Sequence, residues 1–176
     1  TTAGRTVYGG GGIVPDILVK DDTLSGYMFN LMVGNQVDFN FVRSYLDANN
    51  DKFRMSWERD FESFRESFAF TDDEKETFYA LMKEKGLVVD ESVSTPDVSG
   101  DSLIVPPSYV DQTDWMVMGR LKAELARQVW GSPYFYPVIN DVFGDEIKQA
   151  MKQWESVKAL EMLASEARAE DAKALR

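Results

Sequence analysis

Histidine and cysteine are both missing from this chain of 176 residues. Without histidine, a Ser-His-Asp triad cannot form, and the side chain that most often serves as a general base or metal ligand is absent. Without cysteine, disulfides, thiolate nucleophiles and zinc–thiolate sites are excluded. Hydrolytic chemistry in these residues would therefore need a serine–lysine pair, paired carboxylates or a bound ion.

Positive charge is scarce as well, because 19 Lys and Arg residues stand against 30 Asp and Glu residues. The net charge of −11 and the isoelectric point near 4.5 argue against a nucleic acid or an anionic membrane as partner, since phosphate groups are bound by basic patches. No run of about 20 apolar residues predicts a transmembrane helix. The chain does contain 44% hydrophobic residues, enough for the core of one ordinary domain, or of one domain and a fragment.

The first twenty residues have the composition of β-strands. Thr6-Val7-Tyr8 and Ile17-Leu18-Val19 favour strands, and the four glycines from Gly9 to Gly12 allow positive φ or a close backbone approach. Pro15 lacks an N–H, so its strand should begin there or lie at an edge. We predict a short β-hairpin over residues 1–20. Because an isolated hairpin is marginal in water, its strands should belong to a sheet whose other strands are not in this chain.

This stretch also resembles a segment of a known enzyme family. The pattern Gly4-Arg5-x-Val7-Tyr8-Gly9-Gly10-Gly11-Gly12-Ile13-x-Pro15-Asp16 is similar to the segment that closes the catalytic core of the carboxy-terminal processing peptidases, also called tail-specific proteases. A second stretch is similar to the C-terminal helical region of a bacterial subgroup of long, multidomain members. It comprises Leu121 to Gly131, Tyr134 to Val138, and Asn140-Asp141.

The resemblance implies a serine nucleophile and a lysine general base, both upstream of Thr1. The chain would then be the C-terminal, non-catalytic part of a serine endopeptidase, inactive by itself, with no catalytic residue, metal or cofactor of its own. Its partners would be the rest of the peptidase chain and, through it, polypeptide substrates, and its location would be periplasmic or otherwise exported. The motif residues would be structural: Gly4, Arg5, Gly9, Gly10, Gly11, Gly12, Pro15 and Asp16.

Residues 21–176 have the pattern of a helical domain. Apolar residues at helical spacing, with capping signals, predict helices over about 23–35, 37–50, 57–68, 72–86 and 112–130, a short helix or turn at 134–139, and a last helix from 145 onward. Ser56 is the expected cap of the third helix, and Thr71 to Glu74 has the form of a capping box. Residues 88–111 are expected to form a long loop, which either packs on the domain as an arm through Leu103 to Val105 or wraps a neighbouring molecule. The predicted fold is mainly α, a bundle of about five to six helices preceded by the hairpin.

Several patterns allow two interpretations. The stripe Trp57, Phe61, Phe64 and Phe68 could line a ligand site, but core packing explains it better. The aromatic segment 134–139 could likewise form a partner groove rather than pack into the bundle. The acidic cluster at 72–76 could hold calcium, although it lacks the spacing of an EF-hand loop and suits a helix start.

Two further signals are weak. The glycines at 9–12 lack the Lys-Ser/Thr and the helix of a phosphate loop, and Ser25 and Ser56 are placed as helix caps rather than as nucleophiles paired with a lysine. As functions, a free-standing helical interaction module and an enzyme with carboxylate chemistry remain alternatives to the peptidase tail. The bare strands and the last helix, which has little apolar surface to bury beyond residue 163, also predict self-association into a homo-oligomer.

Overall fold

The computed structural model describes residues 25–159, 161–162 and 165. The chain divides into two compact units, one spanning Asp21–Phe143 and the other combining residues 1–20 with residues 144–176. The predicted hairpin over residues 1–20 lies outside the described residues. So do the motif residues Gly4, Arg5, Gly9, Gly10, Gly11, Gly12, Pro15 and Asp16.

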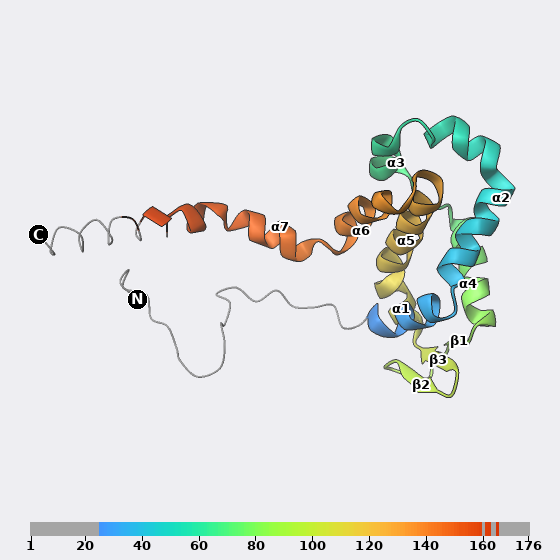
Figure 1. The fold of residues 1–176 in the computed structure, drawn as a ribbon. Coiled ribbons are helices and arrows are strands. Elements are labelled where there is room, and N and C mark those ends of the chain that lie inside the picture. Colours follow the sequence, from blue (N-terminus) through green and yellow to red (C-terminus); the bar gives the residue numbers. More distant parts are fainter. Residues whose placement is uncertain (1–24, 160, 163–164, 166–176) are drawn as a thin grey trace, which may run out of the picture. The chain divides into compact units, whose positions relative to one another are not determined.

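The unit Asp21–Phe143 is a helical bundle with a small sheet at one end (Figure 1). Helix α5 is its centre, since it packs against α1, α2, α6 and the short 3-10 helix η1. The prediction of a mainly α bundle is confirmed. The helices are α1 Ser25–Gly34, α2 Val37–Trp57, α3 Phe61–Ser67, α4 Asp72–Glu84, α5 Pro107–Trp130, η1 Ser132–Tyr134 and α6 Phe135–Phe143.

The predicted boundary between the second and third helices is wrong. The sequence predicts an end at Asn49-Asn50, but α2 continues to Trp57, and Ser56 lies in its last turn. Continuing the helix buries Phe53, which is 3% exposed, and this outweighs the small unfavourable propensity of two asparagines. The N-cap of α3 is Asp60, whose carboxylate accepts a hydrogen bond from the Ser63 amide at 3.0 Å.

The predicted start of α4 is confirmed. The Thr71 hydroxyl accepts from the Glu74 amide at 3.4 Å, and the Thr71 amide donates to the Glu74 carboxylate at 2.7 Å. Glu74 therefore completes a capping box. Gly86, with φ of 105°, follows the end of the helix as expected.

The expectation of a long loop over 88–111 is wrong for most of its length, but its segment Leu103 to Val105 packs on the domain as expected. Strands β1 Leu87–Val89, β2 Asp97–Ser99 and β3 Ser102–Val105 form a sheet in the order β1-β3-β2. β3 runs parallel to β1 and antiparallel to β2. The sheet forms because Leu87, Leu103 and Val105 are buried against the helices.

Helix α5 also begins earlier than the predicted residue 112, at Pro107. Proline suits the first position of a helix because the missing N–H would have no intrahelical acceptor there. The extra turns bury Tyr109, which is 2% exposed.

The aromatic stripe of α3 and the end of α2 lies in the core, as predicted. Phe64 is fully buried and Phe68 is 8% exposed, while Trp57 and Phe61 are half-buried against them. The rings meet edge-on or tilted, the arrangements that aromatic pairs prefer, and they fill the space between α2, α3 and α5.

Helices α5 and α6 cross at Gly119. A Cβ built on this buried glycine would meet the side chain of Val142, with Cγ1 at 2.7 Å and Cβ at 3.1 Å. The absence of a side chain at position 119 is therefore what lets α6 approach α5 this closely.

Replacing Gly119 with leucine should lower the free energy of unfolding by about 1–3 kcal/mol. The cost of overpacking the crossing of α5 and α6 exceeds the free energy gained from the better helix propensity of leucine. Urea denaturation followed by circular dichroism would measure the change. Gly26→Leu in α1 is the matched control, since nothing lies within 4 Å of a Cβ there. Equal stability of the two variants would contradict the close crossing.

In the second unit, α7 spans Asp145–Lys152, where the last helix is predicted to begin. A turn at Gln153 follows, and residues 154–159 are helical again. Large apolar side chains are exposed both on α7 and on the helical residues after the turn: Met151, Trp154, Val157 and Met162.

Candidate functional site

The structure places the second stretch of the peptidase resemblance but not the first. The first, with Gly4 to Asp16, lies outside the described residues, so no geometry brings those residues together. The second occupies the C-terminal half of α5, η1 and α6, which pack on one another. Charged side chains gather at this junction, and they form the candidate site.

The most buried ion pair links α2 to α5. Asp38 is 3% exposed, and its Oδ2 lies 3.1 Å from Nε of Arg120. The Arg120 guanidinium also lies over the rings of Phe29 in α1 and Phe135 in α6, at 5.5 and 4.9 Å from their centroids. One side chain of α5 thus contacts three neighbouring helices by ionic and cation–π attraction.

One turn further along α5, Glu124 is fully buried. Its Oε1 accepts from Gln128 at 3.0 Å, and its Oε2 lies 2.5 Å from the Arg127 guanidinium in an ion pair that lacks good hydrogen-bond geometry. Arg127 in turn lies over Phe135, at 5.6 Å from the ring centroid. We call Asp38, Arg120, Glu124 and Arg127 the charged seam.

A lysine of α5 holds the C-terminal end of α3. Lys122 Nζ donates to the carbonyl oxygens of Arg65 and Phe68, each at 2.8 Å. Burial lowers the pKa of Lys122, while the carboxylate of Asp141 acts in the opposite direction. Arg65 also binds Asp141 of α6 through two hydrogen bonds, of 2.6 and 2.7 Å.

A lysine with a lowered pKa is the kind of general base that a serine–lysine mechanism needs. The Lys122 ammonium, however, donates to two main-chain carbonyls at a helix end, which is a capping arrangement. Of the two serines considered as nucleophiles, Ser25 is the first residue of α1, and Ser56 is exposed in the last turn of α2. The site is therefore built to hold helices together rather than to activate a hydroxyl.

Asp114 of α5 makes the corresponding contact with α4. Its carboxylate accepts from Lys75 at 2.9 Å and from the Tyr79 hydroxyl at 3.0 Å. Burial, and then the Asp114 charge, raise the pKa of Tyr79 well above its usual range, so this phenol stays a hydrogen-bond donor. Polar side chains of α5 thus contact α2, α3 and α4.

The seam is not obvious in the sequence. Its α5 members recur at positions 120, 124 and 127, which is a helical spacing beside the apolar stripe of Leu121 and Leu125. That spacing was the available signal, but charged residues at such positions usually face solvent. Asp38 is 82 residues away from its partner, so only the tertiary structure reveals the pair.

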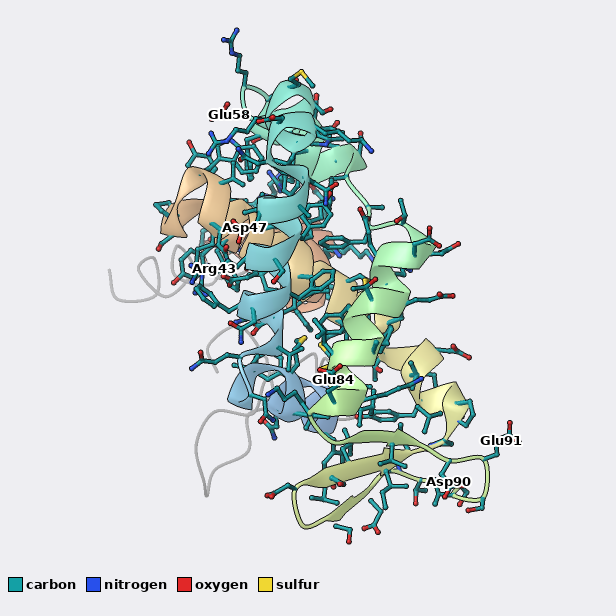
Figure 2. All side chains as sticks on the ribbon, turned by 90° about the vertical axis from the view of Figure 1, so that its right-hand side faces the viewer. Arg43, Asp47, Glu58, Glu84, Asp90 and Glu91 are labelled. Carbon is teal, nitrogen blue, oxygen red and sulfur yellow. The ribbon has the colours of Figure 1, made fainter. Side chains whose placement is uncertain are left out.

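Residues 21–143 are acidic overall. Figure 2 shows carboxylates from Glu58 at one end, through Asp47 and Glu84, to Asp90 and Glu91 near the sheet. Residues 21–143 contain 22 acidic and 11 basic residues, so the net charge of this unit is −11. Within the described residues, no helix is long and apolar enough to cross a membrane.

A family model described as a family of unknown function, DUF8443, matches residues 27–131. The chain belongs to this family. The DUF8443 region begins in α1, ends at Gly131 directly after α5, and contains the charged seam and the small sheet. No curated protein and no solved structure matches the chain.

Proposed function

We propose that this chain is the C-terminal, non-catalytic part of a carboxy-terminal processing serine endopeptidase, in which the DUF8443 region is an accessory helical domain. The observation that carries the proposal is the sequence pattern from Gly4 to Asp16, in a segment whose predicted strands have no predicted sheet partners among the other residues. In this proposal the nucleophilic serine and the basic lysine lie upstream of Thr1.

The division of the chain supports this proposal. The first described helix begins at Ser25 and the family match begins at residue 27, so both leave the glycine-rich pattern outside. A segment of one fold followed by a separate helical unit is what a protease core with an appended domain would contain.

The interior of the helical domain supports an accessory role. Lys122 caps α3, Arg120 pairs with Asp38, and Lys75 pairs with Asp114. These contacts hold α5 against its neighbours. A helical domain held together in this way can support the protease core, position a polypeptide substrate or join copies of the enzyme. Following the resemblance, we further propose that the protein is exported, for example to the periplasm.

In the parent enzyme, lysine kept neutral by desolvation would take the proton of serine as serine attacks the scissile carbonyl. The purified chain of residues 1–176 should accordingly leave an unfolded polypeptide such as reduced casein intact. Gel electrophoresis of samples taken over a day, at micromolar concentrations of the chain, would detect cleavage. Cleavage that a serine-directed inhibitor abolishes would contradict the prediction.

The coding sequence upstream of Thr1 tests the assignment itself. A serine among small residues, followed about one helix and one strand later by a lysine, would support it. Active protein made from the longer gene should then lose cleavage when that serine becomes alanine. A start codon immediately before Thr1 would overturn the assignment.

A free-standing interaction module without enzymatic activity is the second candidate. The exposed apolar side chains Met151, Trp154 and Val157 favour it, because a helix with such a stripe gains stability by covering it. The two candidates differ in what precedes Thr1, so the same coding sequence distinguishes them.

A further inference from the structure

We infer that the free edge of strand β2 binds an extended, positively charged polypeptide segment as an added strand. β2, Asp97–Ser99, is an edge strand because the strands of the sheet lie in the order β1-β3-β2. All three of its residues are exposed, and the Val98 side chain is 55% exposed. The inference does not rest on the proposed function, since it concerns binding by this chain whatever precedes Thr1.

The main chain of Val98 offers a donor and an acceptor at this edge. Val98 lies opposite Leu103 in the antiparallel pair of β2 and β3, and the Leu103 amide donates at 2.8 Å to the carbonyl of Gly86, directly before β1. Val98 and Leu103 are therefore a non-hydrogen-bonded pair, in which the N–H and C=O of Val98 face away from β3. Neither group bonds to another described residue. An extended peptide supplies the matching acceptor and donor.

A groove beside this edge gives the added strand a place for one side chain. The groove has a volume of about 540 Å³ and lies between α1 and the hairpin of β2 and β3, which Figure 1 shows below α1. Tyr27 and Leu31 line it from α1, and Val98 and Leu103 line it from the hairpin. Directly opposed residues of paired strands share a face of the sheet, so the residue that pairs with Val98 stands beside this groove. We expect that residue to be apolar.

The hairpin that carries the edge is held by a close approach to Gly86. A Cβ built on Gly86 would lie 2.5 Å from the carbonyl oxygen of Asp101, and the glycine has φ of 105°. The absence of a side chain at position 86 thus lets the turn at Gly100-Asp101 lie against the chain that leaves α4. A site placed in this way needs little rearrangement on binding.

Charge favours a basic peptide over a second copy of this chain. Residues 83–105 contain five acidic and two basic residues, a net charge of −3, and the unit 21–143 carries −11. Two copies that met edge to edge at β2 would bring these like charges together, whereas lysine or arginine in a partner is attracted.

The acidic residue of the edge strand determines where the basic residues should stand. Side chains alternate along a strand, so Asp97 lies on the face opposite to Val98 and meets a neighbour of the apolar residue. Because an added strand can run in either direction, the preferred segment has Lys or Arg on both sides of that residue. Lys85 and Asp101 also line the groove and contribute one charge of each sign.

The first test is the fluorescence anisotropy of a fluorescein-labelled peptide titrated with the full chain. The basic peptide is Thr-Lys-Leu-Lys-Thr with blocked ends, and Thr-Glu-Leu-Glu-Thr is its acidic match. The basic peptide should bind at least about 10-fold more tightly than the acidic one. Equal binding of the two peptides, or no binding of the basic one at chain concentrations up to about 0.5 mM, would overturn the inference.

Removing main-chain groups separates strand addition from a general attraction of cations. A basic peptide N-methylated at the leucine and the following lysine keeps its charge but lacks the donor for the Val98 carbonyl in either strand direction. It should bind about 10-fold more weakly. Val98→Pro, which removes the outward N–H, should have a similar effect, and Val98→Thr, which keeps both main-chain groups, should bind within about 2-fold of the natural chain. Equal binding of the methylated and unmethylated peptides would overturn the inference.

The groove has its own test. Tyr27→Ala removes a groove side chain and should weaken binding of the leucine peptide about 5-fold, but not that of a peptide with glycine in place of leucine. Tyr136→Ala, on α6 and 63% exposed, is the matched control and should leave both peptides unaffected. Equal effects of the two substitutions would contradict the groove's role.

Sedimentation equilibrium of the full chain tests the other occupant of the edge. The natural chain and Val98→Pro should have the same mass at every concentration. A natural chain that moves from 20.0 kDa toward twice its mass, while Val98→Pro stays at one chain, would show a second copy on β2 and overturn the inference.

Discussion

Replacing Asp38 with alanine is expected to lower the free energy of unfolding by about 3–5 kcal/mol, near the lower end because Arg120 keeps some contact with water. The Arg120 side chain is 16% exposed and the Asp38 side chain 5%. Removing the carboxylate leaves the guanidinium without its counter-charge while Phe29 and Phe135 still hold it in place. The exposed Asp47, also on α2, is the matched control, and Asp47→Ala should change stability by less than about 0.5 kcal/mol.

The double variant Asp38→Leu/Arg120→Met separates the cost of leaving Arg120 buried without a partner from the contribution of the ion pair itself. When both charges are replaced by apolar groups of similar size, no charge stays buried without a partner, so most of the lost stability should return. Urea unfolding followed by circular dichroism measures all three variants. A double variant less stable than Asp38→Ala would show that the ion pair itself stabilises the fold.

Truncating Phe64 to alanine is the second large effect, with an expected loss of about 3–5 kcal/mol. Phe64 is fully buried, and its ring lies 4.9 Å from Phe68 and 4.9 Å from Trp130, measured between centroids. The cavity would lie where α3 meets α5, and neither helix can close it without losing the contacts of Lys122. The emission of Trp130 should shift to longer wavelength as water enters.

Two variants bracket that result. Phe64→Leu keeps much of the volume and should lose less than half as much stability as the alanine variant. Met55→Ala removes an apolar side chain that is 83% exposed and should have almost no effect. A loss below about 1 kcal/mol for Phe64→Ala would mean that the ring cluster is not part of the rigid core.

The sequence predicts well those features that depend on a few neighbouring residues. The capping box from Thr71 to Glu74 and the end of α5 at Gly131 appear where local rules place them. The aromatic stripe of α3 is buried, as predicted from a helical spacing that places its rings on one face of the helix. The peptidase motif from Gly4 to Asp16 is a sequence observation, and it stays a prediction.

The features that the sequence did not predict depend on distant partners. Residues 87–105 contain a sheet because helices α1 and α4 contact its strands, and strands of three or four residues are too short to show a periodicity in the sequence. Helix α2 passes Asn49-Asn50 because Phe53 finds a place among the rings of Phe64 and Phe68. Local propensity is weak beside such burial.

The sequence by itself determined that the chain is a mainly helical, acidic protein, and that it has neither the histidine nor the cysteine of common catalytic and metal sites. Only the tertiary structure decided which charges are buried. Arg120 and Asp38 look like ordinary surface residues until α2 and α5 pack together and exclude water from both. Burial depends on what covers a side chain, and the residues that cover it lie far along the chain.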